Sequence, residues 1–149
     1  MKDAAKHCLL ALALCMYAIS CFCPALESVD PDGLVEETYD GWEALFVGWI
    51  TLLIPSPFWL ANPLFFSAIC FLQSREHPVA AHRTAVVAVF CALWIFRFYA
   101  PFPTNLPVSA RTDFEEYIRV GAWLWLASIL TIWIRTVIDL WESRSRHSP

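Results

Sequence analysis

The chain has 149 residues, of which 58% are hydrophobic, 15% aromatic and only 16% charged, with a formal net charge of −4. A water-soluble domain usually has about 25% charged residues, so the side chains that would cover a solvated surface are missing. Disordered and collagen-like chains are excluded by the same composition, which includes 4 glycines and no repeat. Most of the six cysteines lie within apolar runs, which argues against a disulfide-stapled secreted domain. A polytopic membrane protein remains.

Apolar stretches predict four membrane-spanning helices. A helix needs about 20 apolar residues to cross about 30 Å of hydrocarbon. In chain order, the expected spans are residues 8–26, 58–73, 84–102 and 118–141. The first stretch also fits a cleaved signal sequence, because a short charged segment precedes it and Ala18–Cys21 loosely resembles a lipoprotein cleavage box. A retained helix is favoured, because the leucine typical of that box is missing.

The second apolar stretch, residues 42–72, is too long for one crossing. Pro55 and Pro57 remove two backbone donors and disfavour helix at the residues before them. We therefore expect a short outer-interface helix at about 42–54, before the span at 58–73. A re-entrant half-helix is the alternative, and neighbouring protein would have to cover it. The predicted fold class is an all-α membrane protein, a single membrane domain over residues 1–149.

Charged residues predict the orientation of these helices. One side of the predicted membrane domain has the cations Lys2, Lys6, Arg75, Arg83, Arg144 and Arg146. The opposite side has two acidic loops, 27–41 and 103–117, in which Arg111 is the only lysine or arginine. Because cations are retained on the cytoplasmic side, both termini are expected in the cytoplasm. The predicted location is a plasma membrane that the chain crosses several times.

Three polar residues are expected to converge in the outer leaflet. Asn62, Arg97 and Arg119 each lie near the outer end of a predicted span. Three interpretations stay open. The arginines extend to lipid phosphates; or they form a structural cluster, pairing with Glu43, Glu115 or Glu116 while Asn62 bonds across helices; or the cluster is a pocket for an anion or a lipid headgroup.

Small and aromatic residues are expected to pack at the outer interface. These residues are Gly41, Trp42, Gly48, Trp49, Trp59, Pro63, Trp123 and Trp125. The two glycines are seven apart and share one helix face, which permits close approach to another backbone. We expect Asn62 to compensate for the backbone donor that Pro63 lacks, and so to lock the interfacial helix onto the second span.

Catalytic and metal-binding patterns are weak throughout. No acidic or basic residue lies at the centre of a predicted span, which argues against proton-relay chemistry. The cysteines include no Cys-x-x-Cys pair, and the histidines are expected in a solvated basic rim. We expect no catalytic residues, no metal and no cofactor. Near the cytoplasmic end, Arg135 and Asp139 are four apart on one helix face and can pair.

Two motifs carry a resemblance to known proteins. Gly41-Trp42-Glu43, with Gly48-Trp49 seven residues on, precedes the segment Trp59-Leu60-Ala61-Asn62-Pro63-Leu64. This pattern, together with Gly121–Ser128 in the last span, resembles a widespread type of small, largely uncharacterised bacterial membrane protein. The resemblance implies an architecture and a bacterial origin, and it implies no activity. Pro55 and Pro57 stand where that type usually has a glycine or serine linker.

The expected function is that of a non-catalytic interaction protein of the inner membrane. Its partners would be membrane lipid and another membrane protein or a toxin, with no nucleic acid. It would act as an accessory subunit of a membrane complex, or as an immunity-type protein that blocks a membrane-active toxin through its acidic face. The alternatives are an oligomeric transporter or a lipid- or anion-binding protein that uses Asn62, Arg97 and Arg119, and, second, an integral membrane enzyme.

Overall fold

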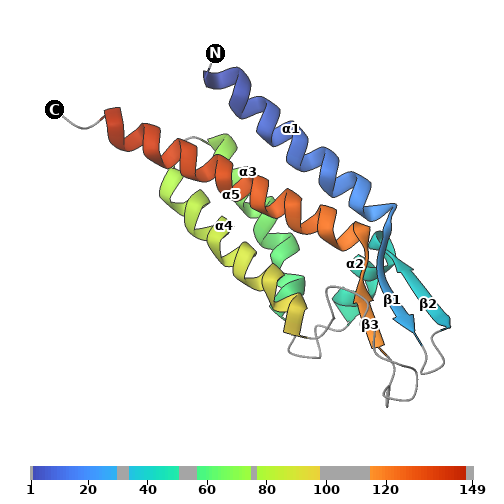
Figure 1. Ribbon diagram of the computed structural model, residues 1–149. Coiled ribbons are helices and arrows are strands. Elements are labelled where there is room, and N and C mark those ends of the chain that lie inside the picture. The colour runs from blue at the N-terminus through green and yellow to red at the C-terminus, as the bar shows by residue number, and fades with distance from the viewer. Residues whose placement is uncertain (1, 30–33, 51–56, 75–76, 98–114, 147–149) are drawn as a thin grey trace.

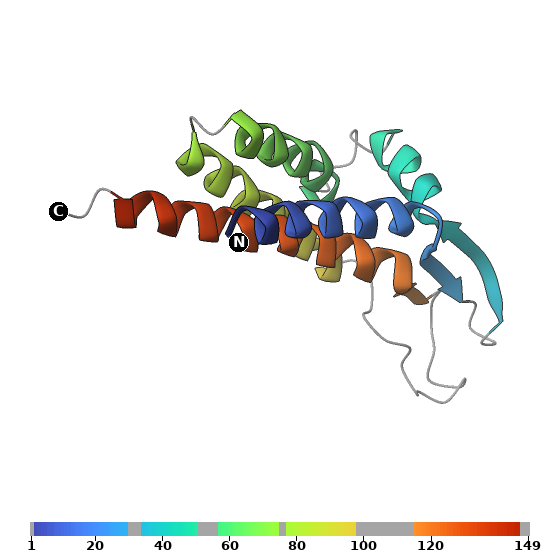
Figure 2. The same ribbon diagram turned by 90° about the horizontal axis from the view of Figure 1, so that it is seen from above.

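The computed structural model describes residues 2–29, 34–50, 57–74, 77–97 and 115–146. Within them the elements are α1 (Lys2–Cys21), β1 (Pro24–Val29), β2 (Val35–Asp40), α2 (Gly41–Ile50), the 3-10 helix η2 (Pro57–Leu60), α3 (Ala61–Ser74), α4 (Pro78–Leu93), the 3-10 helix η3 (Trp94–Arg97), β3 (Glu115–Ile118) and α5 (Val120–Arg146). The helices α1, α3, α4 and α5 form a bundle (Figures 1 and 2). Both chain termini lie at one end of the bundle, and the strands lie at the other.

In the described part of the chain, three helices are long and apolar enough to cross a membrane. They cover Asp3–Cys21, Pro78–Phe96 and Val120–Ser145, which correspond to the first, third and fourth predicted spans. The second predicted span, 58–73, is formed by η2 followed directly by α3. This segment is not one of the described helices that are long and apolar enough to cross. Four crossings therefore remain a prediction.

A small β-sheet corrects the all-α prediction. Its strand order is β2-β1-β3, and both pairings are antiparallel. The segments predicted as acidic outer loops, 27–41 and 103–117, contribute to these strands, and residues 30–33 and 98–114 lie outside the described residues. The strands β1 and β3 pair Leu26 with Ile118, and these two residues are more than ninety positions apart in the sequence. Local hydropathy does not indicate such a long-range partner, so the sequence patterns missed the sheet.

Prolines and glycines set several element boundaries. The first helix ends at Cys21 rather than near residue 26, because Pro24 disfavours helix in the residues before it. Pro78 opens α4 in the first turn, where a missing backbone donor costs least. The predicted interfacial helix, 42–54, is α2, which begins at Gly41 and is described to Ile50. Residues 51–54 of that prediction lie outside the described residues.

The core is built on small residues. The buried side of α4 consists of four alanines, Ala81, Ala85, Ala88 and Ala92. Their spacing of four, three and four places them on one stripe, so neighbouring helices can approach closely. Phe65 of α3 and Ile129 and Ile132 of α5 are the largest fully buried apolar side chains described in the same core. This packing brings α3, α4 and α5 together beside the sheet and positions the site described next.

Candidate functional site

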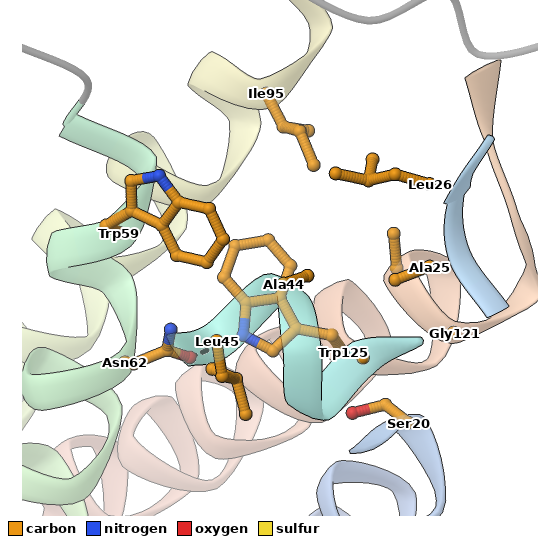
Figure 3. Close-up of a pocket in the computed structure, with 12 residues that line it drawn as sticks. Ser20, Ala25, Leu26, Ala44, Leu45, Trp59, Asn62, Ile95, Gly121 and Trp125 are labelled. Atoms are coloured by element: carbon orange, nitrogen blue, oxygen red, sulfur yellow. Dashed lines mark hydrogen bonds between the residues drawn. The ribbon is translucent and has the colours of Figure 1, made fainter. Parts of the chain in front are cut away.

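A pocket lies where the helical bundle meets the sheet (Figure 3). We call it the junction pocket. The space enclosed within it is small, and the wider volume of about 420 Å³ includes open solvent at its mouth. Its walls are mostly apolar and include Leu26, Leu45, Trp59, Ile95 and Trp125. Among the described residues that line it, none carries a charge.

Asn62 is the buried polar residue of the junction pocket. It is 5% exposed, and its Oδ1 accepts a hydrogen bond from Trp125 Nε1 at 2.7 Å and from Tyr17 Oη at 3.2 Å. An indole nitrogen can only donate, so this contact fixes which end of the amide faces Trp125. Figure 3 shows the amide oxygen towards the Trp125 nitrogen and the amide nitrogen turned away from it. Asn62, a residue of α3, thereby joins α3 to both α1 and α5.

The local sequence around Asn62 favours this arrangement. Pro63 is the third residue of α3, within the first turn, where backbone donors are normally unpaired. Contrary to the prediction, the Asn62 side chain does not replace the backbone donor that Pro63 lacks. It bonds to the two neighbouring helices instead. Tyr17 is held in place by stacking on Phe65, with ring centroids 4.9 Å apart.

Two glycines allow the sheet and its connections to contact the bundle directly. A Cβ atom added to Gly41, the first residue of α2, would overlap the carbonyl oxygen of Ser20 on α1. A Cβ atom added to Gly121 would lie 2.6 Å from the carbonyl oxygen of Cys23. Contacts below 3.0 Å require the neighbouring backbone to shift. Gly41 was predicted as a packing residue, and Gly121 was noted only within a motif.

Arg119 and Glu43, two members of the predicted polar cluster, have different partners. Arg119 pairs with Glu27 of β1, with Nε to Oε2 at 2.8 Å and a second contact from Nη2 to Oε1. Glu43 instead accepts a hydrogen bond from the backbone N–H of Asp40 at 3.0 Å, the arrangement of a capping box at the start of α2. The side chains of Arg97, Glu115 and Glu116 lie outside the described residues.

The predicted interface residues occupy different environments. Trp59 and Trp125 line the junction pocket, whereas Trp42 is 47% exposed. Trp123 packs against Phe96, with ring centroids 5.5 Å apart. Pro63 is exposed. The side-chain environments of Gly48 and Trp49 lie outside the described residues.

A second polar cluster lies at the end with the chain termini. Lys6 Nζ of α1 contacts Asp139 Oδ1 and Glu142 Oε2 of α5 at 2.6 Å each. Arg135 pairs with Asp139, which confirms the predicted i,i+4 pair. The role of Lys6 was missed. The sequence contained a pattern that could have indicated it. Arg135, Asp139 and Glu142 share one face of α5 and include one cation and two anions, so a second cation from another helix would balance their charge.

Little in the described structure supports metal or thiol chemistry. Among the described residues, no three histidine, cysteine, aspartate or glutamate side chains are grouped to hold a metal ion. The six cysteines all carry free thiols. The arrangement of the junction pocket suits recognition of a mainly apolar molecule by contact and neutral hydrogen bonding.

Comparisons with protein-family models, with curated proteins and with solved structures found no match to this chain.

Proposed function

We propose that this chain is a non-catalytic interaction protein of a bacterial inner membrane, and that its sheet binds a basic, extended segment of a partner protein. The observation that carries the proposal is a sheet that has only acidic charges and lies at one end of an apolar helical bundle. An accessory subunit of a membrane complex and an immunity-type protein against a membrane-active toxin are two forms of this function.

Charge on the sheet supports a basic partner. The three strands contain six carboxylates and no lysine or arginine: Glu27, Glu36, Glu37, Asp40, Glu115 and Glu116. Among the strand carboxylates whose side chains the structure describes, Glu27 pairs with Arg119, which follows β3. The remaining negative charge would attract a cationic segment and speed its association, and salt would weaken the attraction.

The position of β2 supports binding by strand addition. In the described part of the chain, β2 is an edge strand of the sheet. Its side chains are largely accessible, since Val35 is 56% exposed and Glu37 and Thr38 are also exposed. An extended peptide can add to such an edge through main-chain hydrogen bonds, and its side chains then supply specificity.

The sheet is firmly joined to the helices, which suits a docking platform. The backbone N–H of Gly41 donates to the Cys23 carbonyl at 3.0 Å, and that of Arg119 donates to the Ala25 carbonyl at 2.9 Å. A platform that is already ordered loses less conformational entropy when a partner binds.

Site-specific photo-crosslinking in intact cells tests the proposal. A photoreactive residue at Thr38, on β2, is expected to capture one protein through a basic segment, identified by mass spectrometry of the crosslinked peptide. The same residue at Phe90, which is 69% exposed on α4, is the matched control and should not capture that segment. The double variant Glu36→Lys, Glu37→Lys should strongly reduce capture from Thr38.

Two results would contradict the proposal, provided that the variants remain monodisperse in detergent. One is the absence of a discrete product from Thr38. The other is a product whose yield does not change on charge reversal or whose crosslinked segment is not basic.

A further inference from the structure

The amide nitrogen of Asn62 is a hydrogen-bond donor without a partner in the described part of the chain. Both hydrogen bonds of this side chain use its Oδ1, and the donor-only indole of Trp125 prevents the amide from turning over. Asn62 is only 5% exposed and lines the junction pocket. Asn62 Nδ2 is not among the fully buried atoms that lack a partner, so a molecule in the pocket can reach it and supply the acceptor that amide donors normally have.

The other walls define the rest of that molecule. Ser20, the other polar lining residue, already donates to the Tyr17 carbonyl at 2.6 Å. Trp59, Ile95 and Leu26 present apolar surface. A carboxylate or phosphate inside the pocket would lack a cationic partner among the described lining residues, and a buried unpaired charge is strongly disfavoured. The fitting ligand is an apolar chain that carries a neutral acceptor such as an ester carbonyl.

The place of the pocket in the fold indicates where such a ligand comes from. A sheet with an open edge and six carboxylates cannot lie in hydrocarbon, whereas α4 and α5 are apolar enough to lie within it. The junction pocket is between these two parts, and Asn62 is the second residue of α3. This is the level of the boundary between headgroups and acyl chains, where the ester groups of membrane lipids are found.

We propose that the junction pocket binds one glycerolipid of the surrounding membrane, with part of an acyl chain against the two tryptophans and the ester carbonyl accepting a hydrogen bond from Asn62 Nδ2. The headgroup would remain outside the pocket, so binding depends on the ester and the chain and not on headgroup charge. This inference is independent of the proposed function, because it uses a different surface and a different ligand.

Native mass spectrometry of the delipidated full chain in detergent tests the inference with a defined pair of probes. A diester phosphatidylglycerol and its diether analogue have the same headgroup and chains, but only the diester has carbonyl groups. We expect one diester molecule per chain, and about fivefold weaker binding of the diether, the effect of losing one neutral hydrogen bond. Free fatty acid should bind more weakly than the diester.

Two variants separate the hydrogen bond from the cavity. Asn62→Asp, studied at a pH that ionises the new carboxyl group, keeps an oxygen acceptor for Tyr17 and Trp125 but has no donor, so the preference for diester over diether should disappear. Ala44→Phe fills the pocket from α2 and should abolish binding of both lipids. Ala18→Phe places the same side chain on an exposed position of α1, outside the pocket, and should bind as the wild type does.

Three outcomes would overturn the inference. They are equal binding of diester and diether by the wild-type chain, retention of lipid by Ala44→Phe, and the absence of a bound diester. The comparison of the two lipids on the wild-type chain does not require any variant to fold, so a failure of Asn62→Asp to fold leaves the test intact.

Discussion

The two ends of the molecule join their elements by different physical means. At the sheet end, backbone contacts dominate, as where Gly41 N–H donates to the Cys23 carbonyl. At the end with the termini, charged side chains join α1 to α5, with Lys6 held between Asp139 and Glu142. The backbone contacts leave no room for a larger side chain, whereas the ionic contacts tolerate changes of shape but depend on charge and salt. The two ends should therefore fail under different perturbations.

The largest effect is expected from filling the closest backbone contact. Gly41→Ala places a Cβ atom against the Ser20 carbonyl, and the backbone must move to relieve the overlap. We expect a loss of about 3 kcal/mol in the free energy of unfolding, measured by thermal or denaturant unfolding in detergent. Ala18→Val, at an exposed position of α1, is the control and should change stability little. Equal stability of Gly41→Ala and the wild type would show that α1 and α2 are not in direct contact.

A smaller loss is expected at the ionic end. In Lys6→Met, the carboxylates of Asp139 and Glu142, whose side chains are 20% and 23% exposed, lose their shared ammonium partner. Breaking a buried pair costs about 3–5 kcal/mol and an exposed pair under 1, so we expect roughly 2 kcal/mol for this partly buried one. The loss should shrink in high salt, unlike that of Gly41→Ala.

Arg144→Met is the matched control for the ionic end. Arg144 is exposed near the end of α5, and removal of its charge should have little effect on the free energy of unfolding. If Arg144→Met and Lys6→Met are equally destabilising, the effect reflects net charge and not the contacts of Lys6.

The smallest effect is expected where the two modes of contact meet, at Arg119 and Glu27. The Arg119 side chain is 38% exposed, so solvent screens the pair, and a double-mutant cycle with Arg119→Gln and Glu27→Gln should give a coupling of about 1 kcal/mol or less. The same cycle with Glu43→Gln in place of Glu27→Gln should give none, because Glu43 caps α2. A larger coupling to Glu43 than to Glu27 would favour the pairing that the sequence predicted.

Part of this structure could be predicted because it depends on neighbours in the chain. The apolar runs over α1, over α4 with η3, and over α5 are about as long as a crossing needs, and three helices of that length and composition lie in the described part of the chain. Arg135 and Asp139 pair because they are one helical turn apart. Pro78 is a typical first residue of a helix and does begin α4, although the predicted third span began at residue 84.

The site was harder to predict because its partners are distant in the sequence. Asn62 was expected to bond across helices, but nothing in the pattern indicated that Trp125 and Tyr17 would both donate to one oxygen. One of the three interpretations paired Arg119 with Glu43, Glu115 or Glu116. Glu27 lies beside Arg119 because β1 pairs with β3.

The sequence by itself determined that this chain is apolar, that its cations and carboxylates are segregated along the chain, and that helices of membrane length form. These properties follow from composition and from spacing over a few helical turns. The tertiary structure alone decided that a three-stranded sheet forms, that Lys6 contacts α5 and that Asn62 lines a pocket. Each of these features requires segments tens of residues apart to meet, and the choice among such partners depends on how the whole chain packs.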